Sequence, residues 1–308
     1  MLNGIRSKYI LQYIINNLDE RKKLQISKYN KNLKLKLEIE EIDYRKYTQI
    51  EIELFLKKFS EDVDKRKFIF INIKEEDKPF CHIFFGNNKK EKERNYVKYN
   101  ENIEKITIIL EMEIKSLNGL FYDCQCIEYI NFIKFNRNDI TNVKSLFENC
   151  VNLLKIDLKK FKTKNVTDMS YMFYNCSSLN ILELSNFITN NVINMNNMFS
   201  WCGCLGGVDL SNFNTEKVIN MGEMFSCCGI LQYIDISNFN FNKVTNMYYM
   251  FSGCESLNDI GIDFKKLNLN NNINTKGMFL GCDEDFIETI KKENINLKEE
   301  AFSIQEYC

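Results

Sequence analysis

The sequence predicts an α/β solenoid of about seven 26-residue units, with parallel strands on a concave face and short helices on the convex face, preceded by a small mixed α+β domain. The main observation is a double column in which each phenylalanine precedes a cysteine by three residues. Five intervals between successive pairs are 26 residues long and the last is 28. Such a period is typical of proteins whose repeats contact only their neighbours. The pairs are Phe121/Cys124, Phe147/Cys150, Phe173/Cys176, Phe199/Cys202, Phe225/Cys228, Phe251/Cys254 and Phe279/Cys282.

The first half of each unit has the apolar spacing of a helix. In the unit Val192–Lys217, the apolar positions after Asn194 fall at i, i+3, i+4 and i+7, which is one face of a helix. Asn194 is a favoured helix N-cap. We therefore expect a short helix in each unit, over Met195, Met198, Phe199 and Cys202 in this one.

The second half of each unit has the spacing of a strand. Leu205, Val208, Leu210 and Phe213 give an L-x-x-L-x-L pattern that buries alternate residues, and the other units repeat these columns with apolar substitutes. Neither element buries its apolar face alone, so stacking must close the core. This is the pattern of a leucine-rich-repeat architecture.

The repeat also resembles a known family. The segment 165–187, NVTDMSYMFYNCSSLNILELSNF, resembles the BspA-like leucine-rich-repeat family, and the similarity covers roughly residues 114 to 282. The resemblance implies a solenoid used for adhesion or protein binding, often on a cell surface. It brings no catalytic residues to this chain.

The charge distribution argues against nucleic acid as a partner. Between Val166 and Asp263 only Lys217 and Lys243 are basic, against nine acidic residues. Phosphate backbones are bound by clustered lysine and arginine, which this stretch lacks.

Four carboxylates are the candidate binding residues. If the strands alternate as expected, Asp157, Glu183, Asp209 and Asp235 point outward in one file, with Ile181 and Tyr233 beside it as apolar anchors. Three interpretations remain open: an acidic stripe that keeps an exposed sheet soluble, a docking strip for a basic or neutral peptide surface, or a calcium ladder.

Catalytic, cofactor and metal sites are not expected. The seven column cysteines and the methionines beside them fit a buried core, although bridges between neighbouring units are conceivable in an oxidising compartment. No C-x-x-C pair or phosphate-binding glycine loop occurs, and His82 is the only histidine.

The sequence predicts three regions: 1–100, helical and then α+β, as a cap or docking module; 101–282, the solenoid; and 283–308, a capping helix and tail. We expect helices over 7–18 and 19–37, strands over 68–73, 80–85 and 106–114, and either a helix or a strand over 47–59. An amphipathic segment over 284–294 predicts the terminal helix.

A second, N-terminal similarity suggests an alternative function. Ile10, Leu11, Ile14 and Leu18, followed by Asp19 and Leu24, resemble an F-box. That resemblance implies a substrate adaptor of a ubiquitin ligase with a Skp1-like partner.

The sequence therefore predicts a non-enzymatic recognition scaffold that binds protein through a concave, acidic face. The alternatives are the ubiquitin-ligase adaptor and a surface adhesion protein exported by an unrecognised route. No apolar run reaches the length of a membrane span and no signal peptide is recognisable, which predicts a cytoplasmic location, whereas the BspA-like resemblance implies a cell surface.

Overall fold

The computed structural model describes residues 46–58, 67–98, 100–262, 273–293 and 297–303. It divides the chain into two compact units, Met1–Gln49 and Ile50–Cys308, and almost all of the described residues belong to the second. The helices expected over 7–18 and 19–37, and with them the F-box-like segment, lie outside the described residues.

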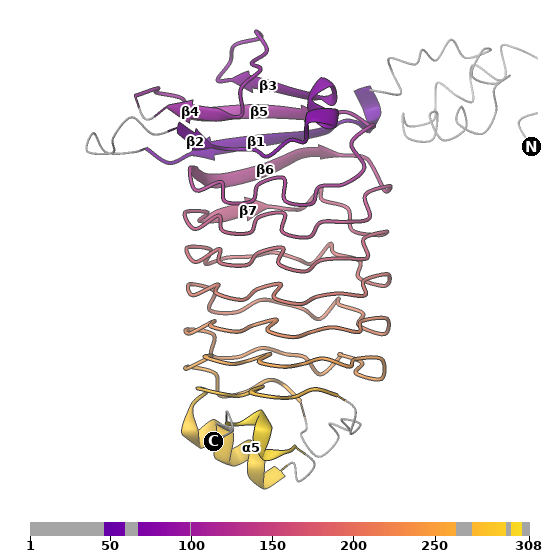
Figure 1. Cartoon of the computed structure of the whole chain (residues 1–308), viewed down its shortest axis with the longest axis vertical. Coiled ribbons are helices and arrows are strands. Elements are labelled where there is room, and N and C mark those ends of the chain that lie inside the picture. Colours follow the sequence, from indigo (N-terminus) through magenta and orange to yellow (C-terminus); the bar gives the residue numbers. More distant parts are fainter. Residues whose placement is uncertain (1–45, 59–66, 99, 263–272, 294–296, 304–308) are drawn as a thin grey trace, which may run out of the picture. The chain divides into compact units, whose positions relative to one another are not determined.

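A five-stranded mixed sheet opens the second unit. Its strands follow the order β3 (Cys81–Phe85), β5 (Lys105–Leu110), β1 (Ile50–Leu56), β6 (Ile127–Phe135) and β7 (Lys155–Asp157). The first three pairings are antiparallel, while β6 and β7 are parallel. The sheet thus joins the region before residue 100 directly to the first strands of the repeats, as Figure 1 shows.

The segment 47–59, which the sequence predicted as either a helix or a strand, contains strand β1. In β1 every second side chain is buried, and Glu51 and Glu53 lie between them. Glu53 also accepts an ion pair from Lys105 on the neighbouring β5, with 2.8 Å between Nζ and Oε1. Apolar residues at a period of two fit the two faces of a strand better than one helix face.

The remaining short elements lie around this sheet. Strands β2 (Lys67–Ile69) and β4 (Tyr96–Lys98) form a separate antiparallel pair. A 3-10 helix, η2 (Glu75–Phe80), leads into β3. The strands expected over 80–85 and 106–114 correspond to β3 and β5, and that expected over 68–73 is reduced to β2.

The prediction of an α/β leucine-rich-repeat solenoid is wrong. The structure is mostly mixed sheet, turns and irregular backbone, and its described residues between Leu120 and Cys282 contain no helix. The expected helix of the unit 192–217 is interrupted by Asn197 and Trp201, whose φ angles are 58° and 62°. Left-handed residues cannot continue a right-handed helix, so this segment forms turns instead. Regular parallel strands likewise end with β7 and give way to isolated bridges such as Lys155 with Ile181.

Backbone hydrogen bonds between successive coils replace the missing helices. In the first half of each coil, alternate N–H groups donate to carbonyls of the next coil: Ser145 to Ser170 at 2.9 Å, and Asn149 to Tyr174 at 2.8 Å. The same pattern recurs from coil to coil among the described residues of 115–282, which we call the coil stack. Figure 1 shows these coils one beneath another between β7 and α5.

The core of the coil stack is a row of phenylalanine rings. Neighbouring rings of the double column stack at centroid separations of 5.4 to 5.8 Å, and the last, Phe279, stacks on Phe302 at 6.0 Å. Each such pair contributes roughly 0.5–1.5 kcal/mol beyond the burial of its area.

The column cysteines are buried beside this row, as the sequence predicted, and their thiols are free. Each from Cys150 onward donates its S–H to the carbonyl of the phenylalanine one coil earlier, for example Cys202 to Phe173 at 3.1 Å. The same carbonyl already accepts a backbone N–H, as when Phe173 accepts from Cys176. Cysteine is therefore a hydrogen-bond donor in this core as well as a small apolar side chain.

A C-terminal segment covers the last coil. The expected helix is present as α5 (Glu284–Glu293), which buries Phe286 and Ile290. After it, the 3-10 helix η3 (Glu299–Ala301) supplies carbonyls to the last coil: Gly277 N–H donates to Glu300 and Phe279 N–H donates to Ala301. Backbone donors that would otherwise be unpaired at the end of the coil stack are thereby satisfied.

Candidate binding faces

The four predicted carboxylates lie in one file along the coil stack. Strands β6 and β7 pair Asn131 with Asp157, and the bridge between Lys155 and Ile181 extends the same 26-residue register to Glu183. Glu183, Asp209 and Asp235 are exposed, and Asp157 is half-buried. We call this file, with Ile181 and Tyr233, the acidic face.

Three of these carboxylates also stabilise a turn. Asp157, Asp209 and Asp235 each accept a hydrogen bond at Oδ1 from the backbone N–H two residues later, at 3.0, 2.9 and 2.9 Å. Aspartate favours this arrangement because its short side chain can mimic a backbone turn. None of the three interpretations drawn from the sequence included this role.

Local hydrogen bonds favour the charged form of two carboxylates of the acidic face, Asp209 and Asp235. The backbone N–H and the side chain of Ser211 lower the pKa of Asp209. The side chain and N–H of Ser237 lower the pKa of Asp235, although the nearby charge of Asp209 opposes the shift. Both carboxylates therefore keep their charge below the pH at which an ordinary aspartate is protonated.

A groove with a mixed polar and apolar lining accompanies the acidic face. Ile181 is 57% exposed and Tyr233 48% exposed, which is unusual for such large side chains. Between their coils lies Gly207, whose lack of a side chain helps to open a groove of about 230 Å³. Ile181, Glu183 and Asp209 line it, so apolar and acidic groups face the same space.

The threonines after the second phenylalanine column have a structural role. Thr163, Thr189 and Thr215 are buried. Each hydroxyl exchanges hydrogen bonds with a backbone position of the next coil, as between Thr189 and Asn214 at 2.7 and 2.9 Å. These side chains hold neighbouring coils together and do not contribute to the acidic face.

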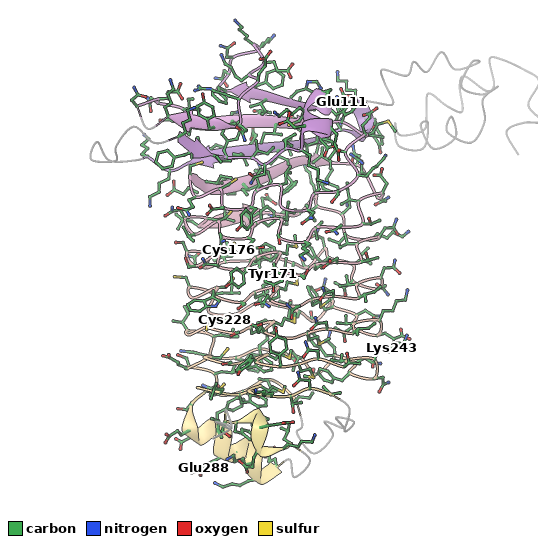
Figure 2. All side chains as sticks on the ribbon, viewed as in Figure 1. Glu111, Tyr171, Cys176, Cys228, Lys243 and Glu288 are labelled. Atoms are coloured by element: carbon green, nitrogen blue, oxygen red, sulfur yellow. The ribbon has the colours of Figure 1, made fainter. Side chains whose placement is uncertain are left out.

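A second group of side chains interacts over several coils. Tyr171 and Tyr174 have ring centroids 5.5 Å apart, and both lie near the charge of Glu223, as does Tyr248. We call these four half-buried residues the tyrosine cluster. Figure 2 shows Tyr171 on the middle coils.

Sequence reasoning missed the tyrosine cluster because it assigned this segment to a helix. On a helix, Tyr171 and Tyr174 would lie on the outer surface with no relation to residues two coils away. The signal was nevertheless present: Tyr171 and Glu223 are separated by 52 residues, which is two periods and places them in one column.

His82 is the centre of a small polar group on the edge strand β3. Its Nδ1 lies 2.9 Å from Glu91 Oε1 and its Nε2 lies 3.1 Å from Glu111 Oε1. Burial, the largest influence, lowers the pKa of His82, but the two carboxylates outweigh it and the pKa is raised. The described residues contain no group of three or more histidine, cysteine, aspartate or glutamate side chains arranged to hold a metal ion.

Within the described ranges, no helix has the length and apolar character needed to cross a bilayer. A comparison with the curated proteins finds no match, and neither does a comparison with the solved structures. The F-box-like resemblance gains no support from the comparisons.

One family model does match. It is described as "Mycoplasma protein of unknown function, DUF285", and it matches residues 115–207 and 182–293. The two matches together run from residue 115 to residue 293, which is more than half of the chain and includes the coil stack and α5. The chain therefore belongs to the DUF285 family of Mycoplasma proteins of unknown function.

Proposed function

We propose that this chain is a non-enzymatic scaffold that binds a partner protein through the acidic face. The observation that carries the proposal is the coincidence of four carboxylates in one file with two exposed apolar side chains, Ile181 and Tyr233, and a groove lined by Ile181 and two of the carboxylates. Protein interfaces commonly combine apolar anchors in a groove with charged groups at the rim.

The chemistry of the acidic face selects a basic or neutral peptide surface. Its carboxylates repeat at about 4.8 Å, the separation of hydrogen-bonded strands, and repel one another unless a cation lies near them. Lysine or arginine side chains relieve that repulsion, while Ile181 and Tyr233 bury apolar groups of the same partner. Such a surface also repels the phosphates of nucleic acids.

The resemblance of the repeat to the BspA-like family supports the same function. That resemblance implies adhesion or protein binding and carries no catalytic residues, and a surface location would fit the adhesive form of this activity. A ligand that bridges several coils would use the whole file, because one coil contributes a single carboxylate to it.

The test is a charge-neutralised variant, Asp157→Asn, Glu183→Gln, Asp209→Asn and Asp235→Asn together. Asparagine keeps the oxygen that accepts the turn hydrogen bond, so we expect the fold to persist and the charge alone to change. Binding of a lysine-rich peptide carrying leucine and isoleucine is measured by calorimetry at low and at physiological salt. We expect the wild type to bind with a strong salt dependence and the variant to bind at least tenfold more weakly.

A matched control removes charges elsewhere. Glu216→Gln and Glu255→Gln neutralise exposed glutamates that are not part of the acidic face, and this variant should bind as the wild type does. The control removes two charges and the test variant four, so weakening in proportion to the charges removed would mean that only net charge matters, and full binding by the test variant would contradict the proposal.

A further inference from the structure

The tyrosine cluster brings three aromatic rings to one carboxylate. Tyr171 and Tyr174 come from one coil, with ring centroids 5.5 Å apart, and Tyr248 comes from a coil three periods later. Tyr248 is hydrogen-bonded to Glu223. Partial burial raises the pKa of each of the three tyrosines, and the charge of Glu223 raises each of them further. All three hydroxyls therefore lie within the electrostatic reach of Glu223.

Two buried oxygens of the described residues, both in the coil after that of Tyr171, have no partner. Asn196 is 8% exposed and Ser200 is fully buried. Among the residues that the structure describes, Asn196 Oδ1 and Ser200 Oγ have no hydrogen-bond partner. Such groups are rare in native structures because each loses its water without replacement.

The free oxygen of Asn196 points into the tyrosine cluster. A Cβ atom built on Gly222 would lie 2.9 Å from Asn196 Oδ1 and 2.5 Å from Cε1 of Tyr248. Because Gly222 has no side chain, the ring of Tyr248 and Oδ1 of Asn196 can both lie close to its Cα atom. The side chain of Asn196 is also hydrogen-bonded to Tyr171, so the amide is held between the tyrosines of the two coils.

We propose that the tyrosine cluster binds the ammonium or guanidinium group of a lysine or arginine side chain presented by a partner protein. The ring faces and the carboxylate of Glu223 attract a positive charge. Glu223 and Asn196 Oδ1 are both acceptors, which a cation with N–H groups can satisfy and a quaternary ammonium cannot. Glu148, whose charge also acts on Tyr171 and Tyr174, disfavours an anion.

The chain itself already places a cation against this cluster. Nζ of Lys144 lies 5.8 Å from the centroid of the Tyr171 ring, within the range of a cation–π interaction. A lysine or arginine side chain of the partner would make the same kind of cation–π interaction with the neighbouring rings, nearer to Glu223. The inference does not rest on the acidic face, because the two sets have no residue in common.

Trp201 provides a direct reporter for the test. It is the single tryptophan of the chain, it follows Ser200, and it is 51% exposed. The full-length protein is titrated with a glycine–serine peptide that carries one lysine, with its arginine counterpart, and with the same peptide carrying acetyl-lysine. Tryptophan emission and calorimetry are both recorded. We expect a saturable response to the lysine and arginine peptides and none to the acetylated one, which has lost its charge.

Two variants localise the response. Glu223→Gln keeps the shape of the side chain and should weaken binding about tenfold, and Tyr248→Leu should weaken it several-fold with the fold verified by circular dichroism. Glu216→Gln, an exposed glutamate in the preceding coil, is the matched control and should leave binding unchanged.

The inference is overturned if the lysine peptide gives neither an emission change nor heat, or if Glu223→Gln binds as tightly as the wild type. Should the four-fold variant of the acidic face abolish the response while Glu223→Gln retains it, the cation lies on the acidic face. The proposed function would then stand and this inference would fail. If Glu223→Gln weakens lysine binding while the acidic face still takes up the lysine-rich peptide, the two sites are separate, as proposed.

Discussion

At the scale of single residues, burial explains why the column cysteines are unreactive. Desolvation raises the pKa of Cys202 to about 12, and it raises that of Cys176 well above the ordinary value. The reactive form of cysteine is the thiolate, which these thiols do not form at neutral pH. Each S–H is moreover engaged with a phenylalanine carbonyl, so both protonation and position hold it in the core.

We therefore expect thiol labelling of the native protein to separate the cysteines sharply. Among the described cysteines, Cys204 is exposed and Cys227 half-buried, whereas the column cysteines are buried. A short treatment with a maleimide, followed by mass-spectrometric mapping, should modify Cys204 first and Cys227 more slowly. Denatured protein, in which every cysteine is labelled, is the control, and rapid native labelling of Cys176 or Cys202 would contradict this account of the core.

At the scale of the structural element, the left-handed residues are the feature that the sequence conceals. Positive φ angles recur at two columns of the coil stack, occupied by residues as different as Ser145, Tyr171 and Asn149. Few of them are glycine, the residue that usually marks such a conformation. Two such residues lie four positions apart in each coil, for example Ser145 and Asn149, and the N–H groups of both donate to the next coil.

Ser145 offers a test of this arrangement, because its φ angle is 54° and its side chain is half-buried. Ser145→Gly should change the free energy of unfolding little, since relief of strain offsets the added freedom of the unfolded chain. Ser145→Val should lower it by about 1–3 kcal/mol, because a β-branched residue fits a left-handed conformation poorly. Denaturant unfolding measures both.

The matched control for Ser145 is Thr141→Val. Thr141 is exposed and belongs to the preceding part of the same coil, where φ is not positive. If valine cost as much at position 141 as at 145, side-chain chemistry and not backbone conformation would be responsible.

These elements also show how far prediction from sequence could go. The period, the buried columns of Phe, Met and Cys, and the outward file of Asp157, Glu183, Asp209 and Asp235 all follow from spacing. Helix and turn could not be distinguished, because apolar residues at i, i+3, i+4 and i+7 are also produced by a coil with a left-handed residue at every fourth position. The tyrosine cluster forms only if this segment is a turn, so it could not be predicted either.

At the scale of the whole molecule, the coil stack is held together by contacts between neighbours. Its hydrogen bonds, ring stacks and thiol contacts each join one coil to the next. Stability in such an arrangement is approximately a sum of repeat terms and interface terms.

Deletion of one whole period, residues 192–217, should therefore leave a folded protein. The deletion joins Asn191 to Val218 and preserves every column, so we expect a cooperative thermal transition at a somewhat lower temperature. Deletion of residues 192–204, half of that segment, would shift every later column out of register and should abolish the transition. Loss of folding in both variants would show that the coils are not interchangeable.

The thiol contacts described above have a consequence for where such a chain can be used. A core whose cysteines are protonated, buried and occupied by hydrogen bonds exchanges little with glutathione or oxygen. The packing of this core requires neither a reductase to keep its thiols reduced nor an oxidase to join them in disulfides. If such a scaffold crossed a membrane from a reducing to an oxidising environment, the structure of its core would not change.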